Sequence, residues 1–361
     1  MSSSIGNLFR LTTFGESHGS SIGGIIDGCP SGFSIDLKNI QDCLDRRKPG
    51  SSSIVSQRKE SDTVEILSGV FEEKTLGTPI GFLIKNIDQK SKDYDALKSI
   101  YRPSHADFTY DKKYGVRDYR GGGRSSARET ANWVVAGAIA AQILKTKGIS
   151  VYSYVSSVGG IDIAENYVNL DLDAIYKSEV RCPCTKSANL MKDIIEKCKD
   201  NGDTVGGCVS TVVKGVPFGL GEPVFNKFQV GIASAVMSIN ACKGISFGSG
   251  FSSSTKTGST ENDEFILKSG VLSTKTNNSG GVQGGITNGE DVCFHVAFKP
   301  VSTLMQSQKT VSEDYKETAF TASGRHDPCV VPRAVCVVES LTAIAILDYY
   351  LLHKTTKMSD L

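Results

Sequence analysis

The sequence has almost no net charge. Its 40 lysines and arginines are balanced by 39 aspartates and glutamates, which gives a net charge of +1 over 361 residues. A nucleic-acid-binding protein usually carries a strongly basic domain or face, and this composition argues against one. The first ten residues also lack the basic and then apolar pattern of a signal peptide. No uninterrupted apolar run approaches the roughly 18–20 residues needed to span a bilayer. We therefore expect a soluble cytoplasmic protein that binds neither membrane nor nucleic acid.

Several motifs of known chemistry are also missing. The chain has no strand–GxGxxG–helix fingerprint, no Walker loop and no GxSxG turn. It has ten cysteines, but only Cys182 and Cys184 form a close pair, and no second pair or histidine pair completes a zinc site. The sequence therefore predicts reduced, mostly buried thiols and no metal.

Positive charge is concentrated in one stretch, "RDYRGGGRSSARETANW", at residues 117–133. Glycines can turn backbone N–H groups toward an anion, and the N-terminus of the following helix adds partial positive charge. Arg124 and Arg128 could clamp carboxylate or phosphate oxygens, with hydroxyl donors at Ser125 and Ser126. This pattern favours an anion site, although a solvated basic loop before a well-capped helix fits the same residues.

Two histidines lie in turn-like surroundings. His18 belongs to "FGESHGSS" and His105 to "YRPSHADF". Histidine titrates near neutrality, so both are candidate proton donors. Either could equally be a surface or structural histidine.

A third candidate motif, "SGRHDPCVVPRA", spans residues 323–334. Asp327 could act as a general base or could simply pair with Arg325. Two further segments, "SGGVQGG" at 279–285 and "FKPVST" at 298–303, combine glycine, lysine and hydroxyl residues. Together these segments indicate a ligand with several phosphate or carboxylate groups.

Hydrophobic periodicity predicts the main elements. A capping box formed by Ser126 and Glu129 predicts the start of the clearest helix, and the charged section 160–203 is expected to be peripheral. The long segment 88–124 has little periodicity, which is typical of a functional loop. The predicted helices are 37–48, 126–147, 227–239 and 332–352, and the predicted strands are 64–70, 80–87 and 292–300.

One short pattern occurs twice. "DGCPSGF" at 27–33 and "KGVPFGL" at 214–220 share Gly-x-Pro-x-Gly after an apolar strand. Internal duplication of a strand-and-helix unit would explain this pattern. Two similar turns could also arise by chance.

Five of these motifs together resemble the chorismate synthase family. "FGESHG", "RPSHAD", "YRGGGRSSARET", "MSINACKG" and "GRHDPC" occur in the family's order, from Gly6 to about Tyr350. The resemblance implies one α+β domain over residues 1–361, a sandwich of helices between antiparallel β-sheets. Its mobile loops are expected near 45–62, 88–124 and 302–325.

The resemblance also implies a reaction. Family members remove phosphate and a C6 proton from 5-enolpyruvylshikimate 3-phosphate in a 1,4-elimination that yields chorismate. They require reduced FMN without net redox change, and they form homotetramers. The reaction is the last common step of the shikimate pathway to aromatic amino acids.

By position, His18, His105 and Asp327 match the catalytic residues of the family: the flavin-protonating histidine, the histidine near the leaving phosphate, and the aspartate linked to loss of the C6 proton. Substrate-side positions are Ser17, Arg47 and Arg128. FMN-contacting positions are Arg124, Ser125, Ser126, Asn240, Ala241, Gly284, Lys299, Pro300, Val301, Ser302, Thr303 and Arg325.

The sequence departs from the family at one position. Many members have a basic residue shortly after the Arg-Pro-Gly turn, where this chain has serines at 51–53. That position has been linked to nicotinamide binding, so NADPH contact is in doubt. We predict a monofunctional enzyme that depends on an external flavin-reducing system. The residues alone leave two rivals, an ATP-dependent phosphoryl-transfer enzyme and a module that binds RNA or an acidic partner.

Overall fold

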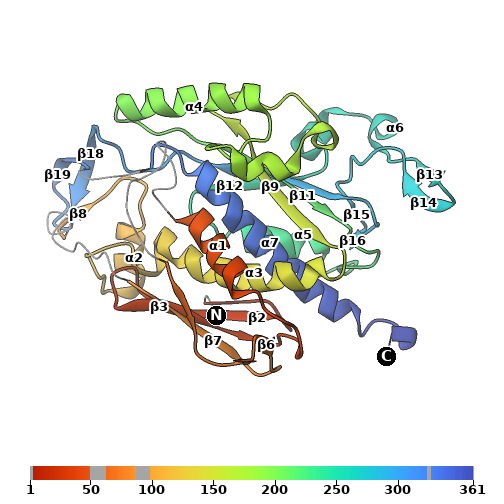
Figure 1. Ribbon diagram of the computed structural model, residues 1–361. Coiled ribbons are helices and arrows are strands. Elements are labelled where there is room, and N and C mark those ends of the chain that lie inside the picture. The colour runs from red at the N-terminus through yellow and green to blue at the C-terminus, as the bar shows by residue number, and fades with distance from the viewer. Residues whose placement is uncertain (1–2, 49–61, 87–97, 323–326, 361) are drawn as a thin grey trace.

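Two five-stranded antiparallel sheets enclose a layer of helices (Figure 1). The computed structural model describes residues 3–48, 62–86, 98–322 and 327–360. The first sheet has the order β1-β2-β3-β7-β4, and the second has the order β10-β9-β11-β17-β12. The strands of the first sheet are β1 (Ser4–Ile5), β2 (Arg10–Gly15), β3 (Ser21–Asp27), β4 (Val64–Ile66) and β7 (Ile80–Lys85). Those of the second are β9 (Ser150–Val158), β10 (Ile161–Asp162), β11 (Gly207–Lys214), β12 (Cys242–Phe247) and β17 (Val292–Phe298).

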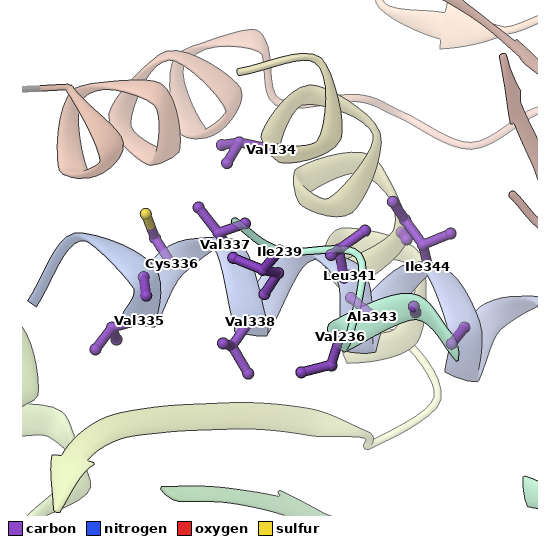
Figure 2. Packing of buried hydrophobic residues seen from close by; sticks show 14 of the residues in the cluster. Val134, Val236, Ile239, Val335, Cys336, Val337, Val338, Leu341, Ala343 and Ile344 are labelled. Carbon is purple, nitrogen blue, oxygen red and sulfur yellow. The ribbon is translucent and has the colours of Figure 1, made fainter. Parts of the chain in front are cut away.

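Four helices form the inner layer. They are α1 (Leu37–Arg47), α3 (Thr130–Lys145), α5 (Phe228–Val236) and α7 (Val331–His353). Helix α7 is apolar on nearly all sides because it packs against α1, α3, α5 and the second sheet. Figure 2 shows Val134 and Val337 between α3 and α7, while Val335 and Val338 point toward the sheet. The layers therefore share one continuous core.

Helix α7 is long and apolar enough to cross a membrane by length and composition, yet 78% of its most apolar window is buried inside the protein. Its acidic residue Asp348 accepts hydrogen bonds from the backbone N–H groups of Asn7, Leu8 and Phe9. The segment just before β2 thus supplies the hydrogen bonds that this buried carboxylate needs. We interpret α7 as the central helix of the core.

The two halves of the chain have the same topology. The first runs β2-β3-α1-β4-β7-α3 and the second runs β9-β11-α5-β12-β17-α7, with equivalent strand orders in the two sheets. Both Gly-x-Pro-x-Gly turns follow the second strand of their half. All four of their glycines, Gly28, Gly32, Gly215 and Gly219, have positive φ, between 72° and 101°. This agreement supports duplication of one unit over chance similarity.

Smaller elements surround this double unit. Helix α4 (Thr185–Asp200) lies outside the second sheet, and β8 (Ile100–Tyr101) joins β18 (Ser307–Ser312) and β19 (Glu317–Thr321) in a three-stranded sheet. The remaining pairs and helix are β5 (Val70–Phe71), β6 (Lys74–Thr75), β13 (Phe265–Lys268), β14 (Val271–Thr274), β15 (Val282–Gln283), β16 (Ile286–Thr287) and α6 (Gly258–Glu261).

The sequence-based prediction was wrong in three places. The segment 88–124 is not one structureless loop, because it contains β8 and α2 (Asp107–Tyr114). The segment 302–325 likewise contains the β18–β19 hairpin. The predicted strand 64–70 ends at residue 66, with β5 starting at residue 70. Most of the loop predicted at 45–62 lies outside the described residues.

The predicted capping box is only half formed. The Ser126 hydroxyl accepts a hydrogen bond from the Arg128 N–H at 3.2 Å, which caps a 3₁₀ turn (Ala127–Glu129) ahead of α3. The Glu129 carboxylate does not return to Ser126, because it pairs with Arg124. An ion pair has therefore displaced the second hydrogen bond of the box.

Candidate active site

A cavity of about 700 Å³ lies where the two halves meet. Its walls come mainly from the segment between β7 and α3 and from the segment between β17 and α7. One wall is apolar and consists of Ile239, Ala241, Val330, Ala334 and Val337. The charged lining residues are Glu16, Arg47, Arg102, Asp107, Arg117, Asp118, Arg128, Lys299, Asp327 and Arg333.

Arg47 and Arg128 share one buried carboxylate. The Arg47 Nη2 lies 2.5 Å from Asp62 Oδ2, and Arg128 pairs with Oδ1 of the same residue. Burial alone would raise the pKa of Asp62, but the two guanidinium groups outweigh it and lower the pKa. Both arginines line the cavity, and Asp62 is a carboxylate partner that they share.

Arg124 has a different position from the one expected. Both of its terminal nitrogens contact Glu129, at 2.6 and 3.1 Å, and Nη2 also donates to the Thr13 hydroxyl at 2.6 Å. Burial raises the pKa of Glu129 despite these contacts. Arg124 is not among the residues that line the cavity. Its guanidinium joins the 3₁₀ turn before α3 to β2, and the predicted contact of Arg124 with a phosphate stays a prediction.

The glycines of the "GGG" stretch provide space for the His18 loop. A Cβ atom on Gly121 would lie 2.1 Å from His18 Nδ1, and one on Gly123 would lie 2.6 Å from a Glu16 carboxylate oxygen. Gly123 also has a φ of +54°. These glycines thus allow residues 16–18 to pack against the loop, a role that composition alone did not reveal.

His18 and Ser17 contact each other directly behind this loop. The Ser17 hydroxyl lies 3.0 Å from His18 Nδ1. Neither residue lines the cavity itself, but both pack against Gly121, which does. The structure thus brings His18 next to the cavity wall without placing it inside.

His105 lies in the cavity, on the turn between β8 and α2. Its Nε2 is 3.0 Å from the Thr303 hydroxyl, which comes from the other half of the chain. Its backbone N–H donates to the Arg102 carbonyl at 3.2 Å. Hydrogen bonds of both its backbone and its side chain therefore hold His105, the candidate proton donor, in place.

The segment 299–303 forms another part of the cavity lining. Lys299 Nζ donates to the Ser302 hydroxyl at 2.5 Å, and its backbone N–H donates to the Ala241 carbonyl at 2.9 Å. Burial and the charge of Lys243 lower the pKa of Lys299. Asn240 donates to the Ser125 carbonyl at 2.7 Å and joins the two halves. Apart from Lys243, these residues all line the cavity, as do Pro300 and Val301.

Gly284 lies elsewhere. It occupies the turn between β15 and β16 and is not among the residues that line the cavity. Its predicted contact with a cofactor stays a prediction. Arg325 lies outside the described residues.

Asp327 lines the cavity and forms an ion pair with Arg333. Arg333 Nε also donates to the Arg47 carbonyl at 3.3 Å. The sequence had offered Arg325 as the partner of Asp327, and Arg333 was not identified. Arg333 is the arginine of "VVPRA", in the first turn of the last helix, and its position close to Asp327 in the sequence could have indicated this pair.

Other cavity residues were also missed. Arg102 and Arg117 both pair with Asp107, at 2.7 and 3.2 Å. Arg102 and Asp107 lie in the motif "YRPSHADF", in which only the histidine has a side chain that titrates near neutrality. Asp62 had no sequence signal, because its role depends on two arginines that the fold brings to it.

A cavity with cations from both halves, a histidine and an aspartate is typical of an enzyme site for a small polyanion. The sequence profile of the chorismate synthase family matches residues 9–351. Chorismate synthase of Christiangramia forsetii is 58% identical over 98% of this chain and 99% of its own, and that of Parabacteroides distasonis is 55% identical over 97% and 98%. A crystal structure of chorismate synthase has a TM-score of 0.78 at 30% identity, covering 98% of this chain and 95% of its own. The chain belongs to the chorismate synthase family.

Family membership confirms the predicted enzyme class and fold. The protein is a carbon–oxygen lyase of the shikimate pathway, with the mixed α+β architecture of its structural relative.

Proposed function

We propose that the cavity binds 5-enolpyruvylshikimate 3-phosphate together with reduced FMN and converts the substrate to chorismate. The observation that carries this proposal is the convergence of six cationic side chains from both halves on one cavity. The substrate has two carboxylates and a phosphate, and FMN adds a second phosphate. Arginine and lysine are the side chains suited to hold such groups.

The residues of the cavity fit a flavin nucleotide. Its volume of about 700 Å³ falls in the upper part of the range for cofactor sites, roughly 300–1,000 Å³. The apolar wall around Ile239 and Val337 could face a planar ring, and Lys299, Ser302 and Thr303 offer donors to its polar groups. Lys299 has no carboxylate partner among the described residues, so its charge is available to an anion. When bound, reduced FMN would supply electron density during loss of phosphate.

The proposed proton transfers use three side chains. His105 would donate a proton to the departing phosphate, because it lies in the cavity beside a hydroxyl partner. Asp327 would assist removal of the C6 proton, and its pairing with Arg333 holds it in place. His18 would protonate the reduced flavin from the far side of Gly121.

Substrate binding is assigned to Arg47 and Arg128, with Ser17 nearby. The shared carboxylate of Asp62 fixes the relative position of the two guanidinium groups. Fixed donors lose less conformational freedom when the substrate binds. This arrangement suits a rigid ring with substituents at defined positions.

Assembly and cellular context are also proposals. We propose a cytoplasmic homotetramer that receives reduced flavin from an external system. All ten cysteines lie in the described residues and none forms a disulfide, as is typical of a reducing compartment. Sedimentation would test the tetramer, and steady NADPH oxidation by purified protein with FMN would contradict the dependence on external reduction.

An anaerobic assay tests the main proposal. Purified protein is mixed with dithionite-reduced FMN and 5-enolpyruvylshikimate 3-phosphate, and chorismate absorbance is followed. Product that requires reduced FMN would support the proposal. A folded protein that binds flavin and substrate but yields no chorismate would contradict it.

A further inference from the structure

The turn that carries His105 is closed by one buried carboxylate. Asp107 is 4% exposed. Its Oδ2 accepts the backbone N–H of Arg102 at 3.1 Å and the Arg102 Nε at 2.7 Å, while its Oδ1 accepts Arg102 Nη2 at 2.7 Å. The Asp107 side chain therefore joins the two ends of the turn 102–107 by hydrogen bonds.

The same carboxylate ties this turn to the rest of the cavity wall. Arg117 Nη1 lies 3.2 Å from Asp107 Oδ1, and Arg117 Nη2 reaches Glu313 after β18 at 3.3 Å. Burial alone would raise the pKa of Asp107, but the contacts with Arg102 and Arg117 lower it. Asp107 is thus an ionised centre that connects the turn to both halves of the chain.

The turn would not keep this shape unaided. Ser104, immediately before His105, has a φ of +58°, which is unfavourable for a residue with a Cβ atom. Its carbonyl accepts a hydrogen bond from the Ser302 hydroxyl at 3.2 Å. Loss of the Asp107 contacts would let the backbone relax and draw the His105 ring away from Thr303.

We propose that Asp107 is a positioning residue that holds His105 in its productive orientation against the Thr303 hydroxyl. The proposal rests on the proposed function in one respect, because His105 is taken as the proton donor of the elimination. Asp107 itself does not transfer a proton.

A double-mutant cycle tests this directly. We compare wild type, Asp107→Asn, His105→Ala and the double variant in steady-state chorismate formation over a range of substrate concentrations. Displacement of a reacting group by about 1 Å can cost on the order of 100-fold, so Asp107→Asn should lower kcat by about 10- to 100-fold with little change in KM. In the His105→Ala background, Asp107→Asn should have no further effect. An equal loss in both backgrounds would overturn the proposal.

A different role of Asp107 predicts a different kinetic signature. If its carboxylate only neutralised Arg102 and Arg117, its removal would lower KM and leave kcat unchanged. Asp111→Asn is the matched control, because Asp111 lies on the same helix and accepts the Tyr101 hydroxyl at 2.9 Å without contacting the turn. We expect its kcat to stay within about twofold of wild type.

A second measurement needs neither flavin nor substrate. The rate at which diethyl pyrocarbonate modifies His105 is measured by mass spectrometry, with His18 as the internal reference. Asp107→Asn should raise the His105 rate severalfold and leave the His18 rate unchanged. An unchanged His105 rate would overturn the positioning role even if wild type formed no chorismate, which would contradict only the proposed function.

A second variant covers the case in which Asp107→Asn does not fold. Arg102→Lys keeps the charge but cannot form the two-pronged contact with Asp107. It should lower kcat less than Asp107→Asn and raise the modification rate of His105 in the same direction. Wild-type behaviour in both assays would contradict the proposal.

Discussion

The two halves of the molecule share a scaffold but differ in the segment that follows their last strand. In the first half, the path from β7 to α3 carries five charged residues that line the cavity, Arg102, Asp107, Arg117, Asp118 and Arg128. In the second half, the path from β17 to α7 carries Lys299 and Asp327. The repeated strands and helices thus set where the site lies, and the unlike connections supply its chemistry.

Neither half can complete the cavity alone. β8 of the first connection pairs with β18 of the second, with Tyr101 opposite Val311. His105 and Thr303 meet across the same boundary. The site therefore depends on how firmly the two halves are joined. Four kinds of substitution test this: at the reacting groups, at the contact between α3 and α7, at a buried carboxylate and at the repeated turn.

The largest effect is expected from the reacting groups, one from each half. His105→Ala and Asp327→Asn should each lower kcat by roughly 100- to 10,000-fold, because each removes a proposed proton-transfer group. Single-turnover formation of chorismate measures this, and circular dichroism checks the fold. If either variant kept a rate near that of wild type, the substituted residue would not take part in proton transfer.

The next effect concerns the seam between the halves, where α3 crosses α7. A Cβ atom on Gly137 would lie 2.3 Å from Ser340 Cβ and 2.4 Å from its Cα. Gly137→Ala should therefore destabilise the protein by about 3 kcal/mol, since overpacking forces the helices apart. Urea denaturation measures the loss.

A compensating variant sharpens this test. Ser340→Gly in the Gly137→Ala background removes the overlap with Cβ but leaves the overlap with the Ser340 Cα at 2.4 Å, so only a small part of the stability should return. Full additivity of the two losses would show that the helices do not meet as described.

A third effect is a pH dependence in the second half. Glu339 on α7 accepts hydrogen bonds from the Tyr176 hydroxyl and from the Ser153 N–H, while Arg46 and Arg181 flank the Tyr176 ring. Burial raises the pKa of Glu339 from 4.5 to about 7. The folded protein therefore binds a proton that the unfolded chain has already lost between these two values.

Stability should consequently fall as pH rises from about 4.5 to 7 and then level off. Glu339→Gln removes this contribution and should abolish a decline on the order of 2 kcal/mol. Urea denaturation of both proteins at pH 5 and pH 8 gives the difference. Equal pH dependence in wild type and variant would contradict the assignment.

Much of the scaffold could be predicted from local signals. The helices α1, α5 and α7 were predicted within a few residues, because their apolar periodicity coincides with turn or capping signals. Strand β2 was missed, since its Gly- and Ser-rich surroundings hide the alternation. β8 and β18 could not be predicted as partners, because Tyr101 and Val311, which pair, are far apart in the sequence.

The site was predicted in part. His105, Asp327 and the 299–303 segment were named in advance and do line the cavity. Arg124 was expected to face a ligand, but its partner Glu129 had been assigned to the helix cap. A cluster of arginines in the sequence shows where positive charge is concentrated. Only the fold shows which of these arginines already form ion pairs with carboxylates.

The smallest effect concerns the repeated turn itself. Gly32 and Gly219 occupy equivalent positions, with φ values of +77° and +101°. A Cβ atom on Gly32 would meet nothing within 4 Å, whereas one on Gly219 would lie 2.6 Å from the His353 ring. Gly32→Ala should cost about 1 kcal/mol from backbone conformation alone. Gly219→Ala adds the displacement of His353 and should cost more, as thermal unfolding would show. A larger loss of stability from Gly32→Ala than from Gly219→Ala would contradict the described difference in the surroundings of the two glycines.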